Sequence, residues 1–123
     1  MRVYISGPII GKDYEERKRE FKRVQQMLEN NGFETFNPME NGVPKDASTS
    51  KHMRADLKQL PDCDAIYFMI GWNHSAGCWT EFNNAAACGL EFMFEKFDAV
   101  PLSYFMPVNA NCPGKVVETI RFK

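Results

Sequence analysis

The sequence predicts one α/β domain built on a mainly parallel β-sheet, and two observations predict it. Short apolar stretches that suit strands alternate with longer stretches of helical periodicity. The stretch AIYFMI, residues 65–70, is apolar throughout, as expected of a strand covered on both faces of a parallel sheet. The 123 residues suffice for a single domain, 1–123, with one core. We expect that core to span 1–95, and 96–123 to be an extension, because prolines interrupt the pattern there.

The first part of the chain predicts two strands separated by a helix. RVYIS, Arg2–Ser6, has the apolar character of a short strand. Asp13 and Glu16 have the spacing of a capping box, so a helix is expected to begin there. Its end is expected at Asn30–Gly32, since glycine commonly follows a helix. FETFNP predicts a second strand, which Pro38 would end.

The second part repeats this alternation after a long loop. Residues 39–51 are polar and contain glycine and proline, and a loop of that length in a small domain is often functional. A helix is expected over Ser50–Leu60, a strand over Ala65–Ile70 and a shorter helix over about Thr80–Cys88. LEFMF predicts a fourth strand, and KVVETIRF near the C-terminus is compatible with one more.

Composition and charge argue against several classes of function. The formal net charge is −1, which disfavours a nucleic-acid partner because phosphate tracking requires a basic surface. No segment approaches the length of a membrane span, and the N-terminus lacks the pattern of a signal peptide. The cysteines have no CxxC spacing, which favours buried, reduced thiols and a cytoplasmic setting. His52 and His74 have no matched partners, so we expect no metal site and no cofactor.

Three loops follow the predicted strands and would meet at one edge of the sheet. They are SGPIIG after the first strand, NPMENG after the second and GWNHSAG after the third. Ligands of parallel α/β sheets bind at the carboxyl ends of the strands, so these loops are expected to line one crevice. Glycines before a helix let backbone N–H groups approach an anion. SGPIIG is not a P-loop, however, and a plain tight turn explains it as well.

Two acidic residues are candidates for chemistry. Asp56 lies on an apolar, core-facing helical stripe, so it is either at the solvated edge of that stripe or placed for a ligand. Glu81 is expected in or near the first turn of its helix, where the helix dipole would keep its pKa low. A low pKa suits a nucleophile or an electrostatic stabiliser better than a general acid. From spacing alone, a plain role at the helix start is favoured for Glu81.

Two aromatic residues lie close to the same loops. Tyr4 alternates with apolar neighbours on the first strand and would ordinarily belong to the core. Trp72 lies in the loop after the third strand, where its ring is suited to stacking on a planar ligand.

Together these segments resemble one family. VYISGPIIG, GFETFNP, MRADLKQLPDCDAIYFMIGW and SAGCWTEFNNAAACG have the order and spacing of the nucleoside 2-deoxyribosyltransferase-like proteins, and they cover residues 2–95. The sequence is most similar to a small branch of that family found in phages and bacteria. The resemblance implies a doubly wound, flavodoxin/Rossmann-like α/β domain. It also implies a homodimer or larger homo-oligomer, and a small-molecule nucleotide as substrate.

The resemblance further implies an activity and its catalytic residues. Family enzymes cleave the N-glycosidic bond of 2′-deoxynucleosides or their 5′-monophosphates, through a glutamate that attacks C1′ as the base leaves. By position, Glu81 would be the nucleophile, and Tyr4 would help to hold and orient it. Asp56 would bind near the base or help to protonate it. An ionised carboxylate beside C1′ would stabilise an oxocarbenium-like transition state.

Substrate-binding residues are implied in the same way. Ser75 stands where family members that act on nucleosides tend to carry an acid, so with the amides around Gly77 it favours a 5′-monophosphate. Ile10 departs from the family pattern, because monophosphate enzymes often carry an arginine in this loop. Asn37 and Trp72 are expected to shape the base pocket. The floor under the sugar or phosphate would comprise Ser6, Gly7, Pro8 and Ile9.

Three functions remain open at this point. The favoured one is an N-glycosidase that hydrolyses a 2′-deoxynucleoside 5′-monophosphate. A deoxyribosyltransferase that exchanges bases is a close variant, since the residues do not distinguish water from a second base as acceptor. A non-catalytic protein that binds or senses nucleotides belongs to another class. The presence of Tyr4, Asp56 and Glu81 together disfavours it, since binding alone does not require them.

Overall fold

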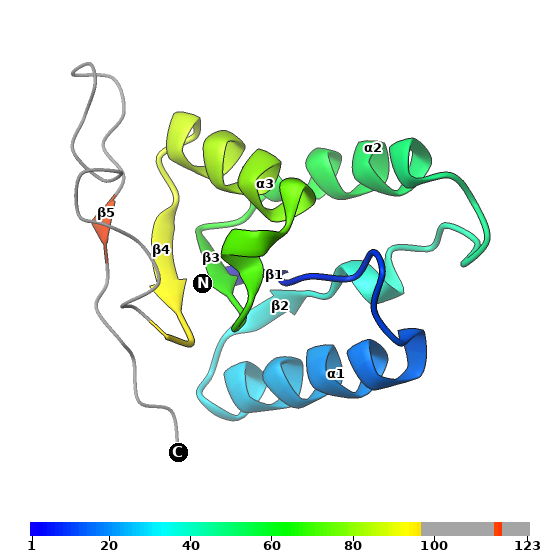
Figure 1. The fold of residues 1–123 in the computed structure, drawn as a ribbon. Coiled ribbons are helices and arrows are strands. Elements are labelled where there is room, and N and C mark those ends of the chain that lie inside the picture. Colours follow the sequence, from blue (N-terminus) through cyan, green and yellow to red (C-terminus); the bar gives the residue numbers. More distant parts are fainter. Residues whose placement is uncertain (97–114, 117–123) are drawn as a thin grey trace.

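The protein forms a doubly wound α/β domain on a five-stranded parallel sheet (Figure 1). A computed structural model describes residues 1–96 and 115–116. The strand order is β2-β1-β3-β4-β5, the order of flavodoxin-like folds, which confirms the predicted fold class. The strands are β1 Arg2–Ser6, β2 Glu34–Phe36, β3 Ala65–Phe68, β4 Glu91–Phe94 and β5 Lys115–Val116.

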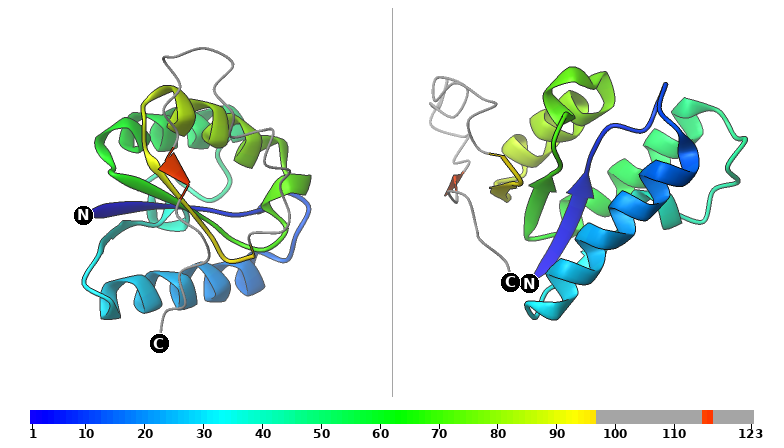
Figure 2. Two further views of the ribbon diagram at one scale, coloured as in Figure 1. Left: turned by 90° about the vertical axis from the view of Figure 1, so that its left-hand side faces the viewer. Right: turned by 60° about the horizontal axis from the view of Figure 1, so that its bottom comes forward.

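In the described residues, three α-helices cover the two faces of the sheet. Helix α1 lies on one face, and α2 and α3 lie on the other (Figures 1 and 2). Their bounds are α1 Tyr14–Asn30, α2 Thr49–Gln59 and α3 Ala76–Ala87. Three short 3₁₀ turns complete the described elements, η1 Pro38–Glu40, η2 Leu60–Asp62 and η3 Trp72–His74. Within the described residues no helix is long and apolar enough to cross a membrane.

The alternation of side chains along β1 divides the core into two clusters. Val3 and Ile5 pack on the α1 face, whereas Tyr4 packs on the α3 face, and all three are fully buried. The α3 face is rich in stacked aromatic rings. Trp72 belongs to this cluster, with its ring centroid 5.5 Å from that of Phe82. The predicted stacking of Trp72 on a ligand is therefore wrong, because this side chain is 1% exposed.

Two helix starts differ from the sequence-based expectation. Asp13 caps α1 by accepting from the backbone N–H of Glu15, while the Glu16 carboxylate pairs with Arg17 and completes no capping box. Helix α3 begins at Ala76, earlier than expected. Its N-cap is Ser75, whose hydroxyl accepts from the backbone N–H three residues on. Glu81 thus lies in the second turn of α3.

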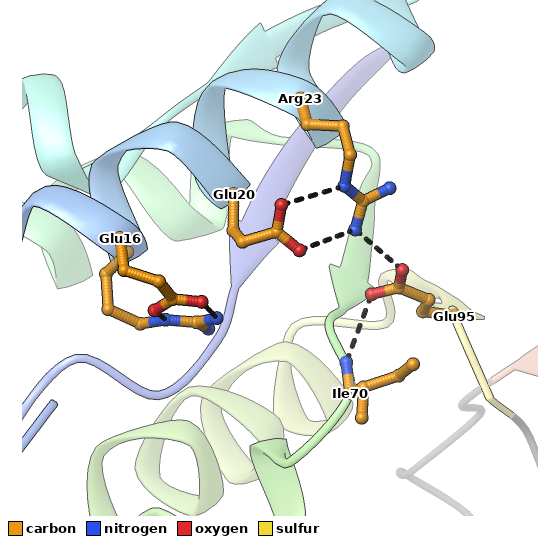
Figure 3. Close-up of polar contacts among 6 residues, drawn as sticks. Glu16, Glu20, Arg23, Ile70 and Glu95 are labelled. Atoms are coloured by element: carbon orange, nitrogen blue, oxygen red, sulfur yellow. Dashed lines mark hydrogen bonds and ion pairs between the residues drawn. The ribbon is translucent and has the colours of Figure 1, made fainter. Parts of the chain in front are cut away.

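A network of charged side chains ties the ends of β3 and β4 to α1 (Figure 3). Arg23 of α1 pairs with Glu95, just beyond β4, at 2.8 Å and with Glu20 at 3.2 Å. The other Glu95 oxygen accepts from the backbone N–H of Ile70 at 3.2 Å. Glu95 therefore links the turn that leads from β3 into α3 to Arg23 of α1.

Expectations for the cysteines and the C-terminal segment are met in part. Cys63 and Cys78 are buried as expected, but Cys88 is exposed. Strand β5 coincides with the start of KVVETIRF. The remainder of that stretch, Cys112 and most of the 96–123 extension lie outside the described residues.

Candidate active site

A cavity of about 230 Å³ lies at the carboxyl ends of the strands. The connection from β1 leads to β2 and that from β3 leads to β4, so the chain turns in opposite directions at this edge. Such a switch point is where open α/β sheets bind their ligands. The cavity is lined by the loop after β1, by η1 and the loop beyond it, by α2 and by the first two turns of α3. Its predicted site residues are Gly7, Ile9, Asp56, Ser75, Gly77 and Glu81.

Glu81 lies at the inner end of this cavity and is held by two hydroxyl groups. Its side chain comes from α3 and is 6% exposed. The Tyr4 hydroxyl donates to Oε2, and the Ser6 hydroxyl donates to Oε1 at 2.8 Å. Tyr4 and Ser6 are alternate residues of β1, so both point to the α3 face of the sheet. The structure thus brings together three predicted site residues, although the two β1 residues lie behind Glu81 and do not line the cavity.

Burial controls the ionisation of Glu81. Desolvation raises the pKa of Glu81 to about 7, while the hydrogen bonds from Tyr4 and Ser6 act to lower it. The expectation of a low pKa is therefore wrong. It assumed that Glu81 occupies the first turn of α3, where the dipole acts most strongly, but the helix begins earlier. Tyr4 remains a donor, because burial and the neighbouring carboxyl raise the pKa of its phenol well above the usual value.

The hydroxyl of Tyr4 is expected to assist the ionisation of Glu81 measurably. Tyr4→Phe removes a donor to the carboxylate, so the pKa of Glu81 should rise by about one pH unit. Titration of the Glu81 carboxyl ¹³C shift by NMR would measure this. Tyr67→Phe removes a phenol buried in the cluster on the α1 face of the sheet and serves as the matched control. An unchanged Glu81 titration in Tyr4→Phe would contradict the assignment.

Asp56 is the second carboxyl of the cavity. It is 7% exposed and lines the cavity, so it does not lie at a solvated edge of α2. Burial raises its pKa to about 6, against the lowering effects of the hydrogen bond from Asn41 and of nearby His52. In the described part of the chain, neither Asp56 nor Glu81 forms an ion pair. Two carboxyls whose pKa values are raised toward neutral pH therefore line one cavity, and the charge of Asp56 contributes to the raised pKa of Glu81.

The other predicted residues fall into two groups. Ser75 and Gly77 line the cavity at the start of α3, where Ser75 also caps the helix. Pro8 instead lines an adjoining depression of about 590 Å³, together with Lys12 and the start of α3. Asn37 does not line the cavity, and its side chain instead caps η1 and donates to Gln25.

Several lining residues were missed by the sequence reasoning. His52 stands one helical turn before Asp56, a spacing that could have identified it. Lys45 lies over the ring of Tyr14, 4.1 Å from its centroid, and both line the cavity. Cys78 also lines it, but burial raises the pKa of this thiol to about 11, so it is a poor nucleophile at neutral pH. No group of metal-ligating side chains occurs within residues 1–96 and 115–116.

Solved structures with this fold include a CMP N-glycosidase and two 2-deoxyribosyltransferases. CMP N-glycosidase BcmB of Clostridium botulinum is 21% identical, with a TM-score of 0.62 over 100% of this chain and 90% of that chain. A 2-deoxyribosyltransferase of Bacillus psychrosaccharolyticus is 18% identical, with a TM-score of 0.63 over 85% of this chain and 80% of that chain. The 2-deoxyribosyltransferase of Leishmania mexicana is 18% identical, with a TM-score of 0.61 over 92% of this chain and 76% of that chain. These neighbours confirm the fold that the sequence resemblance implies.

Comparisons at the level of sequence add a family match. The model of a family described as "Domain of unknown function (DUF4406)" matches residues 1–94. No curated protein sequence matches the chain. The matched residues include Tyr4, Ser6, Asp56, Ser75 and Glu81.

Proposed function

The chain belongs to the DUF4406 family, a domain of unknown function, and from its cavity we propose that it is an N-glycosidase of 2′-deoxynucleoside 5′-monophosphates. One observation carries the proposal. Glu81, at the inner end of the cavity, receives a hydroxyl hydrogen bond on each oxygen and forms no ion pair with any described residue. A buried carboxylate without a cation favours a ligand that develops positive charge beside it. The oxocarbenium-like transition state of glycosidic cleavage is such a ligand.

Glu81 and Asp56 have different roles in the proposed reaction. Ionised Glu81 attacks C1′ of the sugar, and the C1′–N bond breaks with its electron pair moving to the base. Protonated Asp56 gives its proton to the departing base and becomes a carboxylate. Water then attacks C1′ and returns a proton to Asp56, while the C1′–O bond breaks and its electrons return to Glu81. Nucleotide and water become free base and sugar phosphate, and both acids are regenerated.

The pKa values of the two carboxyls decide when they can fill these roles. Burial raises the pKa of both carboxyls into the range around pH 6 to 7, so the pair holds a single proton near neutral pH. The pKa of Glu81, about 7, exceeds that of Asp56, about 6, so the arrangement with the charge on Glu81 and the proton on Asp56 is the minor one. The hydrogen bonds from Tyr4 and Ser6 stabilise the charge on Glu81 in that arrangement. That minor arrangement supplies one acid and one nucleophile at the same pH.

The start of α3 supports a 5′-phosphate as part of the substrate. Ser75 and Gly77 line the cavity at the positive end of the helix dipole. Ser75 also borders the adjoining depression, which Lys12 lines as well. Lys12 would supply the positive charge that the family's monophosphate enzymes often obtain from an arginine in this loop, where this chain has Ile10. The likeness to a CMP N-glycosidase is consistent with a nucleotide rather than a nucleoside.

A panel of nucleosides and nucleotides tests the proposal. Each 2′-deoxynucleoside, its 5′-monophosphate and the matching ribonucleotide would be incubated with the protein, and products separated by chromatography. Free base and deoxyribose 5-phosphate are expected from deoxynucleotides. A new nucleoside formed from an added base would instead identify a transferase. No product, combined with a ligand-induced rise in Tm, would identify a protein that only binds nucleotides.

Ser75→Asp is expected to disfavour phosphorylated substrates. Aspartate is an equally good N-cap, so α3 should be retained. Its charge would repel the phosphate, and kcat/KM for monophosphates should fall about tenfold or more while unphosphorylated nucleosides are unaffected. Ser75→Asn keeps the cap without the charge and is the matched control. Equal losses in both variants would argue against a phosphate at this position.

A further inference from the structure

The side-chain amide of Asn41 makes three hydrogen bonds that fix its orientation. Oδ1 accepts from the backbone N–H of Val43 at 3.0 Å, and this N–H has no acceptor character. Nδ2 must therefore be the donor in the other two contacts. It lies 2.9 Å from Oδ1 of Asp56 and 3.2 Å from Nδ1 of His52. Both hydrogens of the amide are thus used by residues that line the cavity.

This orientation decides where two protons lie. Nδ1 of His52 accepts from Asn41, so in the neutral ring the hydrogen is on Nε2. Oδ1 of Asp56 also accepts from Asn41, so in the protonated acid the hydrogen is on Oδ2. His52 and Asp56 stand one turn apart on α2 and both line the cavity. The cavity wall then presents two neighbouring hydrogen-bond donors.

We propose that Asn41 is a positioning residue that directs the Asp56 Oδ2 proton and the His52 Nε2 hydrogen toward the leaving base. This inference rests on the proposed function for the identity of its ligand. The pair of donors selects bases with two adjacent acceptors on one edge, namely O2 and N3 of cytosine or O6 and N7 of guanine. Thymine presents an N–H at N3, and adenine presents an amino group beside N7, so each opposes one of the two donors.

The charged surroundings of Asp56 come from every element that packs around it. Tyr4 on β1 and Glu81 on α3 are close enough to Asp56 for its charge to contribute to the raised pKa of both groups. His52 acts from α2 itself, and Lys45 lines the same cavity from the preceding loop. Among the described residues, only Asn41 donates a hydrogen bond to the carboxyl group of Asp56. Loss of that bond should raise the pKa of Asp56, because it is the effect that opposes burial most strongly.

Kinetics of Asn41→Ala tests the positioning role. We expect kcat for dCMP to fall about 30-fold with KM changed less than threefold, and the alkaline limb of the pH–kcat profile to move upward. Wild type should cleave dCMP and dGMP at least tenfold better than dTMP and dAMP, and the variant should lose this preference. Asn31→Ala, which changes an exposed asparagine at the end of α1, is the control. A wild-type preference for dTMP or dAMP would overturn the proposal.

A matched pair of substitutions identifies the ring nitrogen that acts. The amide nitrogen of glutamine approximates Nε2 of histidine, whereas that of asparagine approximates Nδ1. His52→Gln should therefore retain the preference for cytosine and guanine, and His52→Asn should lose it. The reverse order would contradict the assigned tautomer.

An NMR measurement separates this inference from the proposed function. Imidazole ¹⁵N shifts of the ligand-free protein report the His52 tautomer directly, whether or not any nucleotide is cleaved. We expect hydrogen on Nε2 in wild type and a mixture of tautomers in Asn41→Ala. Hydrogen on Nδ1 in wild type would overturn the role of Asn41 even if glycosidase activity is found. Hydrogen on Nε2 without any base release would leave the role of Asn41 intact and reject the N-glycosidase.

Discussion

Glu81→Gln is expected to abolish base release while making the folded protein more stable above neutral pH. The activity should fall by about 10³-fold or more, because an amide neither attacks C1′ nor carries the charge that stabilises the transition state. The amide fits the same space; its oxygen accepts from one of the two hydroxyls, and its NH2 group donates to the oxygen of the other. Substrate affinity should therefore change much less than kcat.

The gain in stability follows from the direction of the pKa shift. Burial raises the pKa of Glu81 from 4.5 to about 7, so the folded state holds this proton more tightly than the unfolded chain. Below about pH 4.5 Glu81 is protonated in both the folded and the unfolded state, so its ionisation does not lower the stability of the fold. Between pH 4.5 and 7 the unfolded chain ionises first, and stability falls as pH rises. Above pH 7 the loss is complete, on the order of 1–3 kcal/mol.

Urea denaturation at pH 5 and pH 8 measures this effect. Glutamine does not ionise, so the stability advantage of Glu81→Gln over wild type should be larger at pH 8 than at pH 5. Glu29→Gln changes an exposed glutamate of α1 and should show a small difference that does not depend on pH. A variant less stable than wild type at pH 8 would mean that the ionised carboxylate is better solvated than its burial indicates.

Gly7→Ala is expected to cost about 2 kcal/mol of stability and to disturb the cavity. A Cβ at this position would lie 2.7 Å from Sδ of Met69 and 3.1 Å from Cζ of Phe21. Both neighbours are buried in the cluster beneath α1, so neither can move aside without a loss of packing. The loop after β1 would have to shift outward, and it lines the cavity.

Gly77→Ala is the matched control for this prediction. Its Cβ would lie 3.3 Å from the terminal methyl of Met53, which can rotate away, and at the ordinary contact distance of 3.8 Å from Oγ of Ser75. Alanine also favours the helical backbone of α3, so the free energy of unfolding should stay constant or rise by up to about 1 kcal/mol. Chemical denaturation of both variants gives the comparison. Equal destabilisation at the two positions would show that space around Gly7 is less restricted than the packing indicates.

Much of the framework could be predicted because it depends on local patterns. The period of two along β1 places Tyr4 and Ser6 on one face, and the apolar stretch from Ala65 marks the central strand. Asp56 could be singled out because a carboxyl on an apolar helical stripe needs a partner. These features require no knowledge of distant contacts.

The errors arise where distant contacts decide the outcome. Gly77 lowers the helical propensity of the segment after β3, yet the cap by Ser75 and packing on the sheet start α3 there. That shift takes Glu81 out of the first turn of α3, and burial, which no local pattern reveals, raises its pKa. Trp72 appeared available to a ligand because its loop is polar, but rings from α3 and β4 enclose it. The partners of Asn41 are equally inaccessible to local reasoning, since Asp56 lies on the next element.

The hydrogen bond between Tyr4 and Glu81 joins residues 77 positions apart in the chain. Every strand pairing in the described sheet is parallel, so each must be closed over an intervening crossover. Topologies dominated by such nonlocal contacts fold slowly, because chain entropy is lost before the contacts form. The paired hydroxyls and carboxylate meet only once β1, β3 and α3 have all docked. Completion of the cavity should therefore coincide with the last cooperative step of folding, and ligand binding would report on that step in refolding kinetics.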